Sequence, residues 1–276
     1  MNHKLINDHF QNYKSYSIPK AQLVIADIPY NVGKNAYGSN PAWYIDGDNN
    51  NGESDLAGKV FFDTDNDFKI SEFLNFCSHM LVREPKEKGR APAMVIFCEF
   101  EQQFELIEKA KKYGLNNYIN LVFRKNFSAQ VLKANMRIVG NCEYGLVLYR
   151  DKLPKFNNHG KMVFNCFDVE RDTVTPKIHP TQKSVPLLEK IIKIFTDEGE
   201  VVIDPVAGSG TTLLAAINCN RSAYGFEIKK NFFKDASELI NNKKLELEEI
   251  SKYGLPITAL GEINPTLFDN QRIING

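Results

Sequence analysis

Short aliphatic and β-branched runs alternate with longer amphipathic stretches along most of the chain, and this alternation limits the fold more than any other feature. The runs are KLIN near the start, QLVIA before Asp27, AMVIFC ending at Cys98, YINLVF ending at Phe123, EYGLVLY ending at Tyr149, EVVI before Asp204 and SAYGF before Glu227. Helices are expected between them at 70–82, 101–113, 184–196, 211–219 and 231–252. The pattern predicts an α/β fold with a doubly wound, seven-stranded, mainly parallel sheet. EYGLVLY is the expected antiparallel strand, because the segment that leads to it has little helical pattern.

Length and composition fit one globular domain. The chain has 276 residues, enough to bury a core, so we expect a single domain over residues 1–276. Apolar residues make up 43% and charged residues 25%, as in ordinary soluble proteins. No apolar run approaches the ~18 residues of a membrane span and the start lacks the core of a signal peptide, so we expect a cytoplasmic protein with no membrane partner. The five cysteines are scattered without a CxxC pair, so no disulfide framework and no metal site is indicated.

Two segments lack clear periodicity. Residues 31–68 are rich in Gly, Asn and Asp, which is typical of a long mobile loop after a strand. Residues 151–178 are the best candidate for a small insertion. Positive residues gather between Glu108 and Glu143, where there is no acidic residue. The candidate phosphate contacts in this region, with a solvated protein face as the alternative, are Arg124, Lys125, Lys133 and Arg137.

The segment VVIDPVAGSGTTLLAA, from Val201 to Ala216, joins a predicted buried strand to a turn of small residues and a helix start. Small side chains let a ligand approach the backbone, and a helix N-terminus offers unpaired amides. A triphosphate-binding loop is not indicated, because no lysine follows the second glycine. Leu213 also stands where the third glycine of a dinucleotide fingerprint belongs. The next strand ends at Glu227, 17 residues after Gly210, where a carboxylate can accept both hydroxyls of a ribose or lie on the surface.

A second candidate site lies in LVIADIPY, from Leu23 to Tyr30, at the end of a predicted buried strand. A strand followed by a proline turn is its purely structural interpretation. However, a carboxylate, a rigid proline and an aromatic stand side by side where open α/β sheets bind their ligands. This composition favours a functional site.

Three motifs carry a family resemblance. DIPY, from Asp27 to Tyr30, resembles the DPPY catalytic motif of the amino-methyltransferases, and DPVAGSGTT resembles their methyl-donor motif. HPTQK, from His179 to Lys183, is similar to the element that precedes the donor motif, and LIND, which ends at Asp8, resembles the strand before the catalytic one. The motif order resembles the permuted class called beta. The sequence departs from the family pattern at Ile28, Val206 and Ser184.

The resemblance implies a circularly permuted, Rossmann-like methyltransferase that uses S-adenosylmethionine to methylate an exocyclic base amine in DNA. Its catalytic residues would be Asp27, Ile28, Pro29 and Tyr30. Its cofactor site would be formed by Asp8, His179, Thr181, Lys183, Asp204, Pro205, Ala207, Gly208, Ser209, Gly210, Thr211, Thr212 and Glu227.

An exocyclic amine is a poor nucleophile because its lone pair is delocalised into the ring, so the enzyme must accept both amine hydrogens. The Asp27 carboxylate and the Ile28 carbonyl can do so, since a carbonyl survives a change of side chain and the residue before Pro29 is held extended. Tyr30 would stack on the flipped base. Carbon-5 methylation is not indicated, because no cysteine follows a proline. Adenine is favoured over cytosine because cytosine-amine enzymes of the family usually begin this motif with Ser.

In the permuted class the base-reading element lies between EYGLVLYR and HPTQK, which here leaves about 28 residues, 151–178. So short a segment predicts a short or degenerate recognition sequence, or completion of the surface by a homodimer or by residues 31–68. The expected contributors, with turn capping as the alternative, are Lys155, Asn157, Asn158 and Arg171. Near the end, PTLFD makes Leu267 and Phe268 a candidate sliding-clamp contact, unless they pack on their own domain.

Several other activities are alternatives at this point. The target could be a cytosine amine, an RNA base, or a protein amide, since a related Asn-Pro-Pro-Tyr motif serves glutamine methylation. A non-catalytic DNA-binding subunit is disfavoured because both DIPY and the glycine turn are intact. A nicotinamide oxidoreductase is disfavoured by Leu213.

Overall fold

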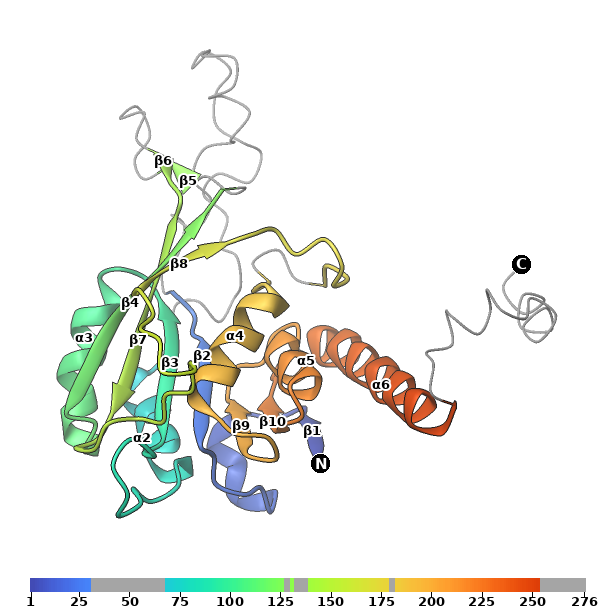
Figure 1. Ribbon diagram of the computed structural model, residues 1–276, viewed down its shortest axis with the longest axis horizontal. Helices are drawn as coiled ribbons and strands as arrows, with labels where there is room; N and C mark the ends of the chain where they lie inside the picture. The colour runs from blue at the N-terminus through green and yellow to red at the C-terminus, as the bar shows by residue number, and fades with distance from the viewer. Residues whose placement is uncertain (31–67, 127–129, 132–138, 179–181, 254–276) are drawn as a thin grey trace, which may run out of the picture.

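The computed structural model describes residues 1–30, 68–126, 130–131, 139–178 and 182–253 (Figure 1). Its main sheet contains, in spatial order, β1 (His3–Ile6), β10 (Ser222–Phe226), β9 (Val201–Asp204), β2 (Leu23–Asp27), β3 (Ala93–Cys98), β7 (Cys142–Tyr149), β4 (Asn117–Lys125) and β8 (Cys166–Val169). β7 is antiparallel to β3 and β4, and the other pairings in this sheet are parallel. The predicted mainly parallel sheet with EYGLVLY antiparallel is therefore confirmed. A separate antiparallel ribbon pairs β5 (Gln130–Val131) with β6 (Val139–Gly140).

The sheet has one strand more than the seven predicted. β8 comes from the middle of 151–178, the segment expected to be an insertion, and pairs with β4 from Val122 to Lys125. Its side chains alternate, with Phe167 and Val169 buried in the core and their two neighbours exposed. Part of the expected insertion is thus an edge strand of the sheet.

Helices cover both faces of the sheet (Figure 1). α4 (Val185–Phe195), α5 (Thr211–Asn218) and α6 (Lys230–Tyr253) lie on one face, and α2 (Ile70–Met80) and α3 (Gln102–Ala110) lie on the other. Each of these helices falls on a predicted helical segment. Two short 3-10 helices, η1 (Phe10–Ser15) and η3 (Lys111–Tyr113), follow β1 and α3. Within the described ranges, no helix is long and apolar enough to cross a membrane.

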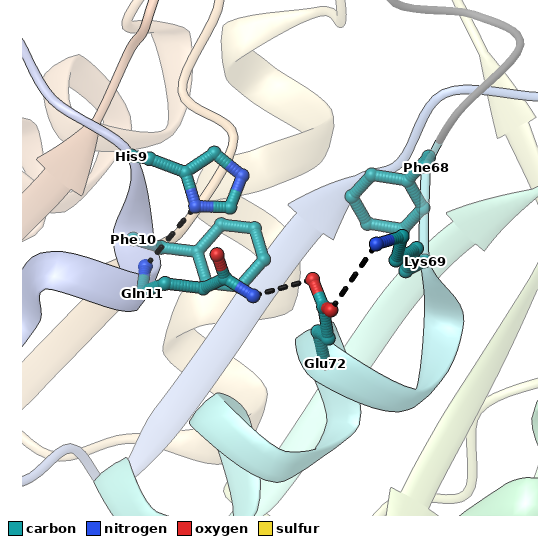
Figure 2. Close-up of a pocket in the computed structure, with 6 residues that line it drawn as sticks. All are labelled: His9, Phe10, Gln11, Phe68, Lys69 and Glu72. Atoms are coloured by element: carbon teal, nitrogen blue, oxygen red, sulfur yellow. Dashed lines mark hydrogen bonds and ion pairs between the residues drawn. The ribbon is translucent and has the colours of Figure 1, made fainter.

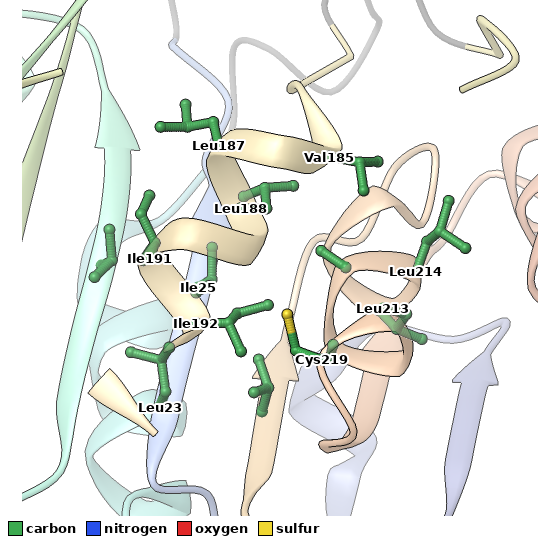
Figure 3. Close-up of a cluster of buried hydrophobic side chains, with 14 of the residues drawn as sticks. Leu23, Ile25, Val185, Leu187, Leu188, Ile191, Ile192, Leu213, Leu214 and Cys219 are labelled. Atoms are coloured by element: carbon green, nitrogen blue, oxygen red, sulfur yellow. The ribbon is translucent and has the colours of Figure 1, made fainter. Parts of the chain in front are cut away.

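Successive residues of β2 point alternately into two apolar cores. Leu23 and Ile25 belong to the core under α4 and α5, whereas Val24 and Ala26 belong to the core under α2. Figure 3 shows the first core, where side chains of α4 lie around Leu23 and Ile25 and α5 packs beside α4. By the same alternation, Asp27 points to the side of the sheet on which α4 begins.

The topology brings the predicted functional segments together. β9 and β2 are neighbours, but the chain continues from β2 outward to β3 and from β9 outward to β10 on the other side. Open α/β sheets bind ligands outside the carboxyl ends of their strands at such a switch point. β2 ends at the predicted catalytic motif and β9 ends at the predicted donor motif, so the two motifs meet at the same end of the strands. We call this end of the sheet, at the carboxyl ends of β2 and β9, the catalytic edge.

Candidate active site

Asp27 ends β2 at the catalytic edge, and both oxygens of its carboxylate have a polar partner. Lys183 Nζ lies 2.8 Å from Asp27 Oδ2, and the Tyr30 hydroxyl donates to Oδ1 at 3.2 Å. Lys183 Nζ also donates to the Tyr30 hydroxyl at 3.3 Å. The structure therefore joins the predicted catalytic carboxylate and aromatic to the lysine of HPTQK.

The backbone of Ile28 and Pro29 is fixed by neighbouring elements. The Ile28 amide donates to the Phe97 carbonyl at 3.2 Å, and the Pro29 carbonyl accepts from Gln102 Nε2 at 2.8 Å. The Ile28 side chain is buried in the core under α2. Ile28, which replaces a proline of the family motif, therefore places an aliphatic side chain in the core, and the hydrogen bonds of the backbone hold the end of β2 in place.

Lys183 connects Asp27 to a second carboxylate, that of Glu143 in β7, which the sequence analysis did not select. Lys183 Nζ lies 3.5 Å from Glu143 Oε2, and Glu143 Oε1 accepts a hydrogen bond from Lys125 Nζ. Lys125, predicted to contact phosphate, is thus engaged with this carboxylate. Two ammonium groups and two carboxylates alternate in the cluster, so their charges balance.

Burial and charge together shift the pKa values in the cluster. Burial raises the pKa of Asp27, and the Lys183 ammonium offsets part of this rise. Burial alone would lower the pKa of Lys183, but the carboxylates of Asp27 and Glu143 outweigh it and hold that pKa well above its ordinary value. Burial also raises the pKa of Tyr30 well above its ordinary value. Lys183 therefore stays charged and Tyr30 stays a hydrogen-bond donor at neutral pH.

The turn after β9 brings its backbone to the catalytic edge. Asp204 accepts from the Val206 amide at 3.0 Å, and burial raises the pKa of this carboxyl to about 7. Gly208 has a φ of 50°, and a Cβ there would meet nothing within 4 Å, so open space lies over its backbone. At Gly210 a Cβ would lie 3.0 Å from Ala236 Cβ of α6. One glycine therefore leaves room for a ligand, and the other lets a helix pack closely.

Glu227 follows β10 and is tied to this turn. Its Oε2 accepts from the Gly208 amide at 2.8 Å and its Oε1 from the Lys229 amide at 2.7 Å. Burial raises the pKa of Glu227. The other predicted residues of the turn are buried around it: Pro205, Ala207, Ser209, Thr211 and Thr212.

A pocket of about 480 Å³ lies one strand beyond Glu227, between η1 and the start of α2 (Figure 2). It is lined by His9, Phe10, Gln11, Phe68, Lys69 and Glu72. Asp8, predicted to bind the cofactor, does not line it. The Asp8 carboxylate accepts from the His9 amide at 2.7 Å, from Asn12 Nδ2 at 2.8 Å and from the Tyr16 hydroxyl at 2.6 Å. Asp8 thus stabilises the turn that forms one wall of the pocket.

Lys155, a predicted DNA contact, lies at the opposite end of the strands from the catalytic edge. Its amide donates to the carbonyl of Ala91, just before β3 begins. Its buried ammonium lies 2.7 Å from Asp197 Oδ2 and 2.5 Å from Glu200 Oε1. The length of β3, roughly 20 Å for its six residues, separates it from the catalytic edge. The prediction for Lys155 is therefore wrong, because an internal ion pair holds the charge that was expected to meet DNA.

Two further predicted contacts belong to the same region. Asn157 Nδ2 donates to the Thr196 carbonyl at 3.1 Å, at the end of α4, and Asn158 Nδ2 donates to the Lys161 carbonyl at 2.9 Å. Asn158 therefore caps its own turn, which was the alternative interpretation, whereas Asn157 caps the carboxyl end of α4. The structure does not bring either of them to the catalytic edge.

Arg124 and Arg171 lie at the catalytic edge, since β4 and β8 run in the same direction as β3. Both are exposed, and Arg124 Nε lies 2.6 Å from Asp168 Oδ1. Several predicted residues lie outside the described ones: Lys133, Arg137, His179, Thr181, Leu267, Phe268 and all of 31–68 but its last residue. Among the residues that the structure describes, no cluster of three or more His, Cys, Asp or Glu side chains could hold a metal ion.

Comparison with known proteins places this geometry in context. The sequence profile of the DNA methylase family N6_N4_Mtase matches residues 21–238. DNA adenine methyltransferase YhdJ of Escherichia coli strain K12 is 27% identical over 293 residues, 94% of this chain and 92% of that protein. The M1.HpyAVI-SAM complex has a TM-score of 0.58 at 20% identity, over 87% of this chain and 100% of that one. The cytosine-N4-specific PvuII DNA methyltransferase has a TM-score of 0.62 at 14% identity, over 87% and 86%. These two structures share the fold.

Proposed function

Because the chain belongs to the DNA methylase family, we propose that it transfers a methyl group from S-adenosylmethionine to the N6 amine of adenine in DNA. The observation that carries the proposal is the meeting of Asp27 with the glycine turn at the switch point of the sheet. The relative that matches over nearly the whole chain is named a DNA adenine methyltransferase, which supports adenine as the target.

The residues at the turn fit the methyl donor, which supplies an activated methyl group on a sulfonium. The open space over Gly208 admits a ligand next to the backbone, and Glu227 offers a carboxylate to ribose hydroxyls. If the sulfonium faces Asp27, the adenine of the donor lies on the other side, toward the pocket walled by His9 and Phe10 (Figure 2). β2 and β1 are three strand spacings apart, roughly 14 Å, which an extended nucleoside amino acid can bridge.

The chain's own groups would act on the target amine at the end of β2. Asp27 would accept a hydrogen bond from one amine hydrogen and the Ile28 carbonyl from the other, and both contacts would strengthen as the nitrogen becomes tetrahedral. As the N–C bond formed, the sulfonium–methyl bond would break, and the nitrogen would then lose one of its protons toward Asp27. The anchored Ile28 amide and Pro29 carbonyl keep these acceptors in place. Tyr30 stacks on the base after it has left the duplex.

A cytosine N4 amine is the second candidate target. The PvuII enzyme, named as cytosine-N4-specific, shares the fold, so the fold alone does not select the base. Both targets present an amine with two hydrogens beside a ring, which the same pair of acceptors can bind. The product, identified directly, separates the two.

DNA would approach the edge that carries Arg124 and Arg171, beyond which the β5–β6 ribbon extends (Figure 1). Lys155 and its neighbours are held at the opposite edge, so only the later part of 151–178 can contribute. A second copy of the chain or residues 31–68 would complete the reading surface. We expect a short or degenerate recognition sequence on the same grounds.

The proposal is tested by incubating the protein with isotope-labelled methyl donor and duplex DNA, then digesting the DNA and identifying the labelled nucleoside by mass. N6-methyladenine is the expected product, and N4-methylcytosine would select the second candidate. The Asp27→Ala variant is the negative control. No label in DNA, with label incorporated when RNA or protein replaces the DNA, would refute the proposal.

A further inference from the structure

Each oxygen of the Asp27 carboxylate has one polar partner in the structure. Asp27 Oδ2 lies 2.8 Å from the Lys183 ammonium, and Oδ1 accepts from Tyr30. The Lys183 side chain is only 7% exposed, so water cannot easily replace Asp27 as its partner. An amine that donates to Oδ2 therefore shares this oxygen with the Lys183 ammonium, which weakens it as an acceptor. A buried ammonium that lost this carboxylate without another acceptor would be strongly destabilised.

Glu143 offers that other acceptor. Its Oε2 is buried and accepts no hydrogen bond from any residue that the structure describes, although Lys183 Nζ lies only 3.5 Å away. A charge-assisted hydrogen bond between these groups is shorter, about 2.8 Å, so a movement of less than about 1 Å would complete it. The other oxygen of Glu143 accepts from Lys125, which fixes the carboxylate in place.

We propose that Glu143 is a positioning residue that takes over the Lys183 ammonium when the target amine binds, and so frees Asp27 Oδ2 to accept the amine. This inference rests on the proposed function, since it assigns a partner to the same catalytic carboxylate. Lys183 keeps one carboxylate throughout, and its positive charge stays close enough to favour the ionised form of Asp27. The movement also takes positive charge away from the nitrogen as that atom becomes cationic during methyl transfer.

Charged and titratable groups face this cluster from every strand around it. Asp27 and Tyr30 come from the end of β2, and Glu143 from β7. The thiol of Cys98 comes from β3, and its pKa, raised by burial to about 12, keeps it neutral. Burial raises the pKa of Asp204, at the end of β9, and Asp27 lies close enough for its charge to raise that pKa further. Glu143 is thus the only carboxylate other than Asp27 that contacts Lys183 among the described residues.

The test is Glu143→Gln, which keeps the shape of the side chain and removes its charge. Lys183 should then stay on Asp27, so we expect kcat to fall about 10- to 100-fold, the range for loss of a hydrogen bond between charged groups. KM for the methyl donor should not change, because Gly208 and Glu227 are untouched. Glu105→Gln, the same substitution on the exposed face of α3, is the matched control and should behave as wild type.

A pH profile distinguishes positioning from a purely structural role. The Glu143 charge raises the pKa of Asp27, so removing it should move the acid limb of kcat/KM to lower pH. A structural role would lower thermal stability and, through the same loss of charge, also move that limb, but it would leave the plateau of kcat at higher pH unchanged. If Glu143→Gln does not fold, Glu143→Asp carries the test: its shorter carboxylate should lower kcat with the acid limb unmoved.

Wild-type kcat in either folded variant, or an unmoved acid limb in Glu143→Gln, would overturn the inference. Failure of the wild-type chain to methylate DNA would instead refute the proposed function. The two failures are distinguishable because the first requires an active wild-type enzyme.

Discussion

Asp204 allows a sharp test of the electrostatics of the donor turn. Its carboxyl is 3% exposed at the end of β9, and burial raises its pKa from 3.8 to about 7. The side chain already accepts from the Val206 amide. Asp204→Asn keeps this acceptor and resembles the protonated acid, so it removes the titration with little change of shape.

Between about pH 4 and pH 7 the folded state binds more protons at Asp204 than the unfolded state does, so this group lowers stability as pH rises. A pKa difference of about three between the folded and the unfolded state corresponds to about 4 kcal/mol of unfolding free energy. Asp204→Asn should therefore match the wild type near pH 4 and exceed it by up to about 4 kcal/mol at pH 8. A carboxylate that weakens the fold at neutral pH is expected where it serves a ligand.

Urea unfolding at a series of pH values, without methyl donor, measures the difference. His3 titrates in the same window with the opposite sign, because burial lowers its pKa from 6.5 to about 4. Its contribution is common to both proteins and cancels when the variant is compared with the wild type. A difference that stays constant from pH 4 to pH 8 would refute the argument for Asp204.

Three further predictions concern the catalytic edge. Asp27→Ala should lower kcat by ~100-fold or more and leave donor affinity unchanged by calorimetry, because this acceptor acts mainly in the transition state; near-normal turnover would exclude the role. Glu227→Ala should weaken donor binding about 10-fold or more, since it removes a charged hydrogen-bond partner. An unchanged Kd for the methyl donor would contradict the placement of its ribose beside Glu227. Arg124→Ala should weaken DNA binding and reduce the slope of log affinity against log salt concentration by about one, whereas Lys155→Met should only change stability. An equal loss of DNA affinity in both variants would contradict the placement of DNA at the catalytic edge.

Much of the fold could be predicted because strand and helix periods are local. β2 and β3 are short apolar runs buried on both faces, and α4 has a continuous apolar stripe, so pattern and structure agree. The meeting of DIPY with the glycine turn could also be expected, because parallel strands bring their carboxyl ends to one edge.

β8 could not be predicted on the same grounds. Its four residues, from Cys166 to Val169, bury only two apolar side chains, at alternate positions. Pairing with β4 makes this a strand, and so short a pattern does not distinguish a strand from a loop. Lys155 was predicted to contact DNA for a related reason. Its partners Asp197 and Glu200 lie more than 40 positions away in sequence, so nothing in the sequence indicates the ion pairs that hold its ammonium.

Glu143 shows how an antiparallel strand brings new chemistry to a parallel sheet. Parallel strands bring to the catalytic edge only their last residues and those that follow, and attention to strand ends finds Asp27, Asp204 and Glu227. β7 runs the other way, so its first residues, and not its last, reach that edge; Tyr144 pairs with Cys98, where β3 ends. In the sequence Glu143 therefore looks like a polar strand start, which is the position least expected to touch a site. A search of this family for positioning residues should accordingly begin at the amino end of the strand that is expected to be antiparallel.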